Sequence, residues 1–343
     1  MMVANSDMAT NALDYITIRG FKSIASIEKL ALRPINVVIG PNGSGKSNLL
    51  GVFEFLYEIY GERTVDRLKD YVTAAGGAEK ILHFGSKATR EIVFDFSFRQ
   101  GYYELRLRPT VDDGLYLYGG QLTTVRDLSW RVYHFEDTSF SSPMRKTARV
   151  DDNRFLRADG ANLPAFLYLL HEKHKDSYDL IVRTVQRVAP FFEDFRLDPL
   201  RLRPDDIKLE WRHKRSDQYF DASSLSDGTL RFIALATLFL QPEQYRPSVI
   251  LVDEPELGLH PYALEVLAAL VRQASVTTQV IISTQSSLLL DHFQPEDILV
   301  ADRVDGGTQL TRLESPHLAK WLEDYSLGQL WEKNELGGRP VPG

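Results

Sequence analysis

The alternation of apolar and polar residues predicts strands in the first part of the chain. Short runs in which every second residue is apolar are typical of half-exposed antiparallel strands. Gln100-Gly101 separates two of these runs and predicts a β-hairpin, which the later runs could extend into a wider antiparallel sheet. The alternating runs are residues 14–20, 91–99 and 102–108, a further strand is expected at 26–32, and residues 115–118 and 129–135 could extend the antiparallel sheet.

The pattern changes towards the C-terminus, where short apolar runs alternate with helical patterns. This alternation predicts a parallel α/β sheet. Its expected strands are 249–252, 280–283 and 298–302, and its expected helices are 262–274 and 287–293. The middle of the chain predicts a polar loop or mobile insertion at 139–160, helices at 162–171 and 178–188, and short strands at 195–202 and 207–211.

One continuous apolar run, Ile35–Ile39, is followed by Gly-Pro-Asn-Gly-Ser-Gly-Lys-Ser at residues 40–47 and then by a helical pattern to about Tyr60. This order of strand, glycine-rich loop and helix is the context of a phosphate-binding loop. Glycines let the backbone N–H groups point at one phosphate, and the helix N-terminus adds partial positive charge. A chance glycine-rich turn is the alternative, but every fixed position of the pattern is present.

Within this loop we expect Lys46 to reach the β- and γ-phosphates of a nucleotide and the Ser47 hydroxyl to hold Mg²⁺. The expected nucleotide-binding residues are Asn42, Gly43, Ser44, Gly45, Lys46, Ser47 and Asn48.

A second candidate for chemistry is the end of the apolar run 249–252, where Asp253 and Glu254 follow. In a parallel sheet this position lies at the carboxyl edge, as the phosphate loop does. Asp253 would then bind Mg²⁺, and Glu254 could polarise an attacking water. A solvated acidic turn is the alternative.

The segment Leu225–Thr229 precedes an apolar helix that reaches Leu240, so Ser226 or Asp227 is a natural N-cap. A helix N-terminus with a hydroxyl and a glycine N–H also suits a phosphate. Capping and phosphate binding do not exclude each other.

Composition limits the possible classes of protein. Hydrophobic residues make up 43% of the chain and charged residues 25%, as in a soluble globular protein. No apolar stretch approaches the ~20 residues of a membrane span. The net charge of −7 argues against an overall basic nucleic-acid-binding domain, and the absence of cysteine excludes a disulfide scaffold and is typical of a reducing cytoplasm. Residues 1–13 resemble a disordered leader.

In order along the chain, the loop at 40–47, the segment at 225–229, the strand into Asp253-Glu254 and the segment Glu256–Pro261 resemble the Walker A, signature, Walker B and D-loop motifs of ABC-type ATPases. Gly20–Ile24 resembles the SMC and RecF branch. Glu256–Pro261 and Leu327–Glu332 are similar to stand-alone AAA family ATPases of prokaryotic repair and phage-defence loci. OLD-type ATPases without their nuclease domain are a related group.

This resemblance implies an α/β fold: an ABC/RecF-like P-loop ATPase head with a mixed sheet, an antiparallel β-subdomain and an inserted helical lobe. The expected parts of this single head are an ATP-binding lobe at 14–138, a loop with a helical and strand lobe at 139–224, and an α/β part at 225–343. It also implies ATP and Mg²⁺ as cofactors.

The resemblance further implies a homodimer that encloses two ATP molecules. Ser226 and Gly228 of one copy would then contact the γ-phosphate held by the other copy, and Glu254 would be the catalytic base. Gln285 stands where transporters have a switch histidine. Since glutamine cannot take up a proton as histidine does, we expect slow hydrolysis. The signature carries Asp227, which adds negative charge near a phosphate.

The expected task of the head depends on partners. The stretch between Ser47 and Ser226 has no heptad run for an SMC arm, and too few residues follow Asp302 for an OLD-type nuclease domain. One hypothesis is an ATPase that acts on DNA in repair or phage defence. The other is a regulatory ATP-sensing module that holds or releases an effector such as a nuclease or toxin. A transporter ATPase is a third and weaker alternative.

DNA contact would depend on two local clusters of basic residues, whose alternative role is as solvated faces balanced by nearby acidic residues. The clusters are Arg145, Lys146, Arg149, Arg154 and Arg157, and Arg201, Arg203, Lys208, Arg212, Lys214 and Arg215.

Overall fold

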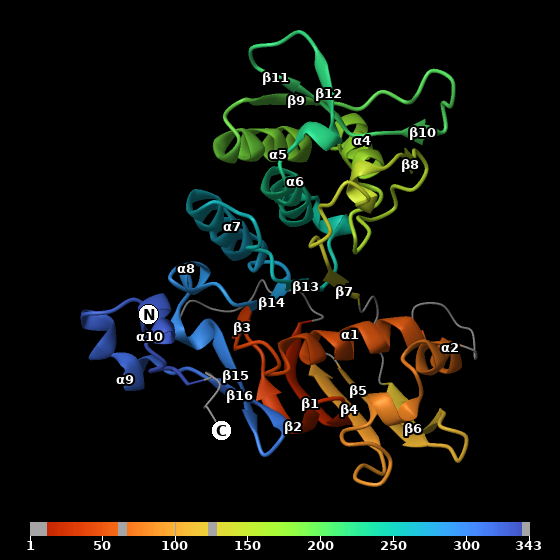
Figure 1. Ribbon diagram of the computed structural model, residues 1–343, viewed down its shortest axis with the longest axis vertical. Helices are drawn as coiled ribbons and strands as arrows, with labels where there is room; N and C mark the ends of the chain where they lie inside the picture. Colours follow the sequence, from red (N-terminus) through yellow and green to blue (C-terminus); the bar gives the residue numbers. More distant parts are fainter. Residues whose placement is uncertain (1–11, 61–66, 100, 123–128, 338–343) are drawn as a thin grey trace. The chain divides into compact units, whose positions relative to one another are not determined.

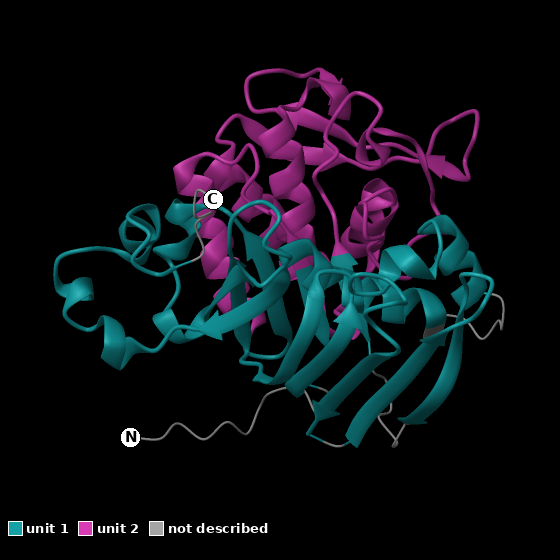
Figure 2. Ribbon diagram, turned by 60° about the horizontal axis from the view of Figure 1, so that its bottom comes forward, with its two compact units in different colours: residues 1–132, 248–251, 276–343 teal, residues 133–247, 252–275 magenta. Residues whose placement is uncertain are grey.

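The computed structural model describes residues 12–60, 67–99, 101–122 and 129–337, so most of the expected leader and the hairpin residue Gln100 lie outside the described residues. The chain forms two compact units (Figure 2). Unit 1 comprises residues 1–132, 248–251 and 276–343, and unit 2 comprises residues 133–247 and 252–275.

Unit 1 contains a five-stranded sheet with the order β2-β1-β4-β5-β6. All its neighbouring strands are antiparallel, and the β4–β5 hairpin that the alternating pattern predicts is present. Aromatic side chains of β4 pack against α1 (Lys46–Tyr60): the rings of Phe96 and Phe53 are 5.4 Å apart, and those of Phe94 and Phe55 are 5.7 Å apart. The strands are β1 (Leu13–Phe21), β2 (Ile24–Ala31), β4 (Ile92–Phe98), β5 (Gly101–Pro109) and β6 (Leu115–Leu122).

A second, six-stranded sheet has the order β16-β15-β3-β14-β13-β7, and the last residues of β7 and β13 are assigned to unit 2. Its central strand β3 is parallel to both β14 and β15, as predicted, and all five residues of β3 are buried. The strands are β3 (Ile35–Ile39), β7 (Trp130–Tyr133), β13 (Val249–Asp253), β14 (Gln279–Thr284), β15 (Ile298–Val304) and β16 (Gly307–Arg312).

The placement of residues 129–135 in the antiparallel sheet was wrong. The structure puts β7 at the edge of the six-stranded sheet, next to β13. The physical reason is that alternation shows which face of a strand is buried but not which strand lies beside it. Trp130 still reaches the core of unit 1, because its indole N–H donates to the carbonyl of Phe53 at 2.9 Å.

The remaining elements of unit 1 are short helices around the two sheets (Figure 1). Gly76 and Gly77, which interrupt the helical pattern after α1, have φ values of 84° and 101° and separate α2 from α3. The short helices are α2 (Arg67–Ala74), α3 (Ala78–Ile81), α8 (Ser287–Leu290), α9 (Ser315–Leu318), α10 (Leu327–Glu332) and the 3₁₀ turns Pro295–Asp297 and Trp321–Glu323.

Unit 2 is built on four helices and small sheets (Figure 1). Helix α6 is its core, since every residue from Leu230 to Leu240 is buried. The helices are α4 (Leu163–Lys173), α5 (Lys175–Val188), α6 (Asp227–Leu240) and α7 (Pro261–Ala274). The strands are β8 (Ala148–Arg149), β9 (Phe192–Arg196), β10 (Asp206–Ile207), β11 (Glu210–His213) and β12 (Tyr219–Asp221), with 3₁₀ turns at Pro143–Arg145, Ala222–Ser224 and Glu243–Tyr245. Across the described ranges, no helix has the length and apolarity needed to cross a lipid bilayer.

Candidate functional site

The loop at residues 40–47 leaves β3 and enters α1, as the sequence predicts, and two of its glycines are required by their surroundings. A Cβ atom on Gly45 would lie 1.9 Å from the Thr308 hydroxyl, and a Cβ atom on Gly40 would lie 2.4 Å from the Ala301 carbonyl. Gly43 has a φ of 81°, and a Cβ atom there would meet nothing within 4 Å. The loop is therefore packed against β15 and β16 on one side and open at Gly43.

Lys46 is held across this loop. Its ammonium donates to the carbonyls of Gly40 at 2.7 Å and Pro41 at 3.1 Å, and the residue is only 5% exposed. Ser44 is 2% exposed, and its hydroxyl has no hydrogen-bond partner among the described residues. A buried hydroxyl without a partner is costly unless a ligand or water satisfies it. A curled loop with a buried cation and this hydroxyl fits a bound phosphate.

A hydrogen-bonded chain of side chains connects the loop with two other segments of unit 1. Asn48 donates to the Ser23 hydroxyl at 2.6 Å, and the Ser23 hydroxyl is 2.6 Å from the Thr308 hydroxyl. Thr308 in turn donates to the Ser44 carbonyl at 2.9 Å. The sequence pointed to Asn48 but not to Thr308, because neither periodicity nor motif spacing marks a threonine on the late strand β16.

A pocket of about 340 Å³ lies beside this chain of hydrogen bonds, within unit 1. Its lining combines Lys22, whose pKa is lowered by burial, with the exposed ring of Phe84 and the guanidinium of Arg303. Arg303 also donates to the carbonyl of Gly43 at 3.3 Å. The pocket thus places cations and an aromatic ring next to the phosphate loop, which suits an anionic ligand that carries a flat ring.

Gln285 follows β14 at the same end of the sheet as the loop. Thr284, the last residue of β14, is opposite Ile39, the last residue of the parallel strand β3. The next residues, Gln285 and Gly40, therefore leave the sheet at the same edge.

In unit 2, Ser226 is the N-cap of α6, one of the two candidates for this position. Its hydroxyl accepts the Thr229 N–H at 3.2 Å and lies 2.8 Å from the Thr229 hydroxyl. Ser226 and Asp227 are exposed at this helix end. The N-terminus of α6 therefore presents the Ser226 hydroxyl and the Asp227 side chain to solvent.

Gly228 contacts the segment that follows the acidic pair. A Cβ atom on Gly228 would lie 2.2 Å from the carbonyl oxygen of Gly258, so no larger residue fits there without displacing backbone. His260 then caps α7, since its Nδ1 accepts the N–H of Tyr262 at 3.3 Å. The residues at 225–229 and 256–261 are therefore one packed arrangement within unit 2.

The two acidic residues after β13 differ in burial and backbone geometry. Asp253 is 9% exposed, and Glu254 is partly exposed with a φ of 40°. A non-glycine residue in this left-handed region carries backbone strain, which clusters at functional positions. Oxygen ligands such as the Asp253 carboxylate and the Ser47 hydroxyl are those that Mg²⁺ prefers. Each of these two residues, Asp253 in unit 2 and Ser47 in unit 1, thus has a donor atom of a type that fits Mg²⁺.

The two basic clusters are largely balanced by acidic neighbours. Arg149 and Arg157 pair with Asp151 and Asp152, while Arg203, Lys208 and Arg212 pair with Asp206, Glu210 and Glu193. Arg145 has a side chain only 6% exposed and is paired with Asp227. Its inclusion in a DNA-facing cluster was wrong, because α6 and its preceding turn bury it.

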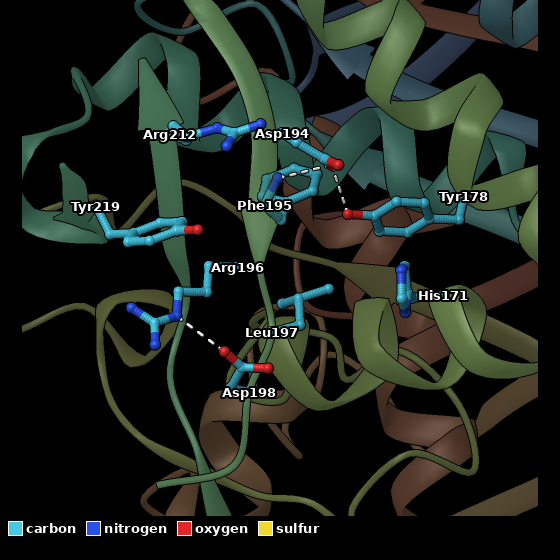
Figure 3. Close-up of a pocket in the computed structure, with 9 residues that line it drawn as sticks. All are labelled: His171, Tyr178, Asp194, Phe195, Arg196, Leu197, Asp198, Arg212 and Tyr219. Atoms are coloured by element: carbon cyan, nitrogen blue, oxygen red, sulfur yellow. Dashed lines mark hydrogen bonds and ion pairs between the residues drawn. The ribbon is translucent and has the colours of Figure 1, made fainter. Parts of the chain in front are cut away.

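Unit 2 also has a pocket of about 290 Å³ that the sequence did not indicate (Figure 3). At its back the Tyr178 hydroxyl donates to Asp194 at 2.7 Å, and Asp194 also accepts the Phe195 N–H at 2.8 Å. At its mouth Arg196 pairs with Asp198 at 2.9 Å and lies over the ring of Tyr219. Most charged side chains around this pocket are therefore already paired with neighbouring residues.

Comparison with solved structures gives the same architecture as SMC heads. The crystal structure of an SMC head bound to the C-terminal winged-helix domain of ScpA aligns with a TM-score of 0.62 at 16% identity, over 90% of this chain and 99% of that one. An SMC head with an extended coiled coil, bound to the C-terminal domain of ScpA derived from Pyrococcus furiosus, aligns with a TM-score of 0.59 at 16% identity, over 91% and 98%. At this identity the likeness shows the fold, so the expected ABC/RecF-like P-loop ATPase head is confirmed as an architecture.

A local sequence relative is the chromosome partition protein Smc of Desulfitobacterium hafniense (strain Y51), which is 35% identical over 91 residues. The match covers 26% of this chain and 7% of that protein. A family model described as "AAA domain, putative AbiEii toxin, Type IV TA system" matches residues 35–291, which include the phosphate loop, the signature segment and the acidic pair. The chain therefore belongs to this family of AAA domains.

Proposed function

We propose that this protein binds and hydrolyses ATP at the loop of residues 40–47, as an SMC-like head in the cytoplasm. The observation that carries the proposal is the loop itself: Lys46 is held across it by two carbonyls, and the buried Ser44 hydroxyl has no partner among the described residues. The adjacent pocket with Lys22, Phe84 and Arg303 offers room for the rest of a nucleotide.

The proposed roles follow the chemistry of each side chain. Lys46 holds the β- and γ-phosphates, and Ser47 with Asp253 holds Mg²⁺, which neutralises phosphate charge when it is bound. Glu254 polarises the attacking water. Gln285 orients the γ-phosphate or that water by hydrogen bonding, and its inability to carry a proton is consistent with slow turnover.

In this proposal two copies of the chain enclose two ATP molecules. Ser226 and Gly228 of one copy complete the site of the other, which the exposed position of Ser226 at the N-terminus of the 14-residue helix α6 supports. A monomer then binds ATP but hydrolyses it poorly.

The process that this ATPase serves has two candidates, DNA repair or phage defence by direct action on DNA, and control of an effector partner such as a nuclease or toxin. The ion pairs across both basic clusters favour the second, because balanced clusters offer little net charge to a DNA backbone. Two of the similar solved structures are SMC heads bound to a domain of ScpA, so a partner protein has a precedent in this fold.

The test of the proposal is steady-state ATP turnover by the full chain. Lys46→Ala and Glu254→Gln should each reduce turnover by at least ~100-fold, within the range of effects measured when charged catalytic groups are removed. Lys87→Ala and Glu265→Gln change exposed residues of the same types and serve as matched controls. Unchanged turnover in both Lys46→Ala and Glu254→Gln would refute an ATPase at this site.

Two further measurements address the dimer and its task. Turnover per molecule should fall when the protein is diluted below the dimerisation range, and constant turnover would contradict the shared site. One outcome would favour control of an effector partner: the protein forms ATP-dependent dimers, binds no duplex DNA and co-purifies with another protein from the native host. Duplex DNA binding by the isolated protein, with a steep dependence on salt, would favour direct action on DNA.

A further inference from the structure

Three potential metal ligands meet in unit 2 where the chain leaves β7. His134 and Glu136 flank the buried Phe135. His134 is half-buried and Glu136 is exposed, so the two polar side chains lie on the side of the chain opposite to Phe135. The third member of this set is Asp253. The ligand atoms of His134, Glu136 and Asp253 all lie within 4.8 Å of one another.

The backbone that carries His134 and Glu136 is fixed from outside this set. The buried guanidinium of Arg231 on α6 donates to the carbonyl of Phe135 at 2.9 Å and to that of Glu136 at 2.7 Å. The N–H of His134 donates to the carbonyl of Ala158 at 2.9 Å. The two side chains are therefore presented at a defined position without the help of a ligand.

The distances and donor types suit a metal ion. Nδ1 of His134 lies 3.6 Å from a carboxylate oxygen of Glu136. Ligand atoms bound at about 2.0–2.2 Å to one ion are separated by roughly 3–4 Å, so small side-chain rotations would close the set. One imidazole and two carboxylates suit Mn²⁺, Fe²⁺, Co²⁺ or Zn²⁺, whereas Mg²⁺ prefers oxygen ligands only.

We propose that His134, Glu136 and Asp253 bind a divalent transition-metal ion, with Mn²⁺ as its representative. The inference rests on the proposed function in one respect: Asp253 is also the proposed Mg²⁺ ligand of the ATP site, so the two ions would compete for this one carboxylate. Motif spacing does not predict this set, because His134 and Glu136 lie far from Asp253 in the chain and fit no metal-binding pattern.

The experiment titrates the chelator-treated full chain, without nucleotide, with Mn²⁺ and follows the free ion by its EPR signal. We expect one Mn²⁺ per chain, bound at least ~10-fold more weakly in His134→Ala and in Glu136→Gln, since loss of even an outer-shell partner of a metal costs that much. Excess Mg²⁺ should displace Mn²⁺ poorly from the unaltered protein.

The matched control is His317→Ala. His317 lies 3.7 Å from Glu314, as an exposed histidine–glutamate pair, so its loss should leave the Mn²⁺ isotherm unchanged. Equal Mn²⁺ affinity in the unaltered chain, His134→Ala and Glu136→Gln would overturn the inference. Since Glu136 is exposed, Glu136→Gln keeps the test valid if His134→Ala fails to fold.

The outcomes separate this inference from the proposed ATPase. If Mn²⁺ binding depends on His134 and Glu136 but the protein shows no ATP turnover, the metal site is supported and the proposed ATPase is refuted. Normal turnover with Mg²⁺, in a chain whose nucleotide-free form binds no Mn²⁺, would overturn the metal site and leave the ATPase standing.

Discussion

A side-chain nitrogen of Arg145 lies 2.9 Å from the carboxylate of Asp227, the first residue of α6. The same guanidinium donates to the carbonyls of Thr138, Ala222 and Leu225. Arg145 therefore offsets the negative charge that Asp227 brings to the signature segment, and it attaches the turn at residues 138–145 to that segment.

Arg145→Ala should lower the free energy of unfolding by about 2–4 kcal/mol, because it leaves buried carbonyls without their donor and Asp227 without its cation. Chemical denaturation of the purified protein measures this difference. Arg145→Lys is the control, because it retains the positive charge but not the several N–H donors of the guanidinium. It should therefore recover only part of the lost free energy of unfolding. Full recovery would show that charge alone matters at this position.

Asp227→Asn should be tolerated by the fold, since the Asp227 side chain is 65% exposed. Removing its charge beside a proposed phosphate should tighten ATP-dependent dimerisation, by up to about 1 kcal/mol for an exposed charge near a helix N-terminus. Analytical ultracentrifugation with and without ATP measures the shift. Weaker dimers in Asp227→Asn would mean that Asp227 contributes by a contact of its own.

Gly228→Ala should separate nucleotide binding from turnover. The added Cβ atom would lie 2.2 Å from the Gly258 carbonyl, so the signature segment must shift, while the phosphate loop of unit 1 keeps its own contacts. We expect ATP binding to persist and turnover to fall at least ~10-fold, which corresponds to 1.36 kcal/mol of activation free energy.

The control for this substitution is Gly119→Ala, where the nearest atom to the new Cβ would be 3.9 Å away on Arg106. Isothermal titration with a non-hydrolysable ATP analogue measures binding, and phosphate release measures turnover. Loss of both in Gly228→Ala alone would indicate a folding defect rather than a displaced segment.

Lys22 should give the stability of the protein a distinctive pH dependence. Burial lowers the pKa of this ammonium below its ordinary value of 10.5, although the nearby charge of Glu54 opposes the shift. The unfolded chain then binds the proton more tightly than the folded protein, so stability should rise with pH between the folded pKa and 10.5. Lys22→Arg, which stays charged, should lack this rise.

Urea denaturation of the unaltered protein and Lys22→Arg at several pH values up to 10.5 tests this prediction. The difference between the two proteins isolates Lys22 from other groups that titrate in this range. Nucleotide affinity should show the opposite trend, since Lys22 lines the pocket beside the loop and loses its positive charge as the pH rises. Parallel pH profiles of stability would contradict the prediction.

Tyr178→Phe tests the pocket of unit 2. Tyr178 is 1% exposed, and both burial and the neighbouring Asp194 raise the pKa of its hydroxyl. The substitution removes the hydrogen bond to the Asp194 carboxylate and should lower the free energy of unfolding by about 1–3 kcal/mol. Tyr219→Phe, at the exposed mouth of the same pocket, should change it by less than about 0.5 kcal/mol.

Much of the fold could be predicted from local pattern, because strands and helices differ in the spacing of their apolar residues. The phosphate loop, the strand before it, the β4–β5 hairpin and the helix that begins at Asp227 were all predicted near their observed positions. The position of β7 was not, since its neighbour β13 begins more than a hundred residues later in the chain.

The surroundings of the candidate sites were less predictable for the same reason. Thr308 on β16 contacts the phosphate loop because β16 pairs with β15, which in turn pairs with β3. Arg145 contacts Asp227 although the two residues are 82 positions apart in the chain. Such contacts depend on distant parts of the chain. A single sequence shows the residue types but not which of them meet.

The parallel pairing of β3 with β14 and β15 also determines the order in which the protein can be completed during synthesis. The hairpins β1–β2 and β4–β5–β6 join segments close in sequence and can form early, whereas β3 gains both of its neighbours only after residue 298 has left the ribosome. Closing so long a chain segment is slow. The nascent protein therefore carries its phosphate loop on an incomplete sheet until that point, which delays any nucleotide-dependent activity until both β14 and β15 have been synthesised.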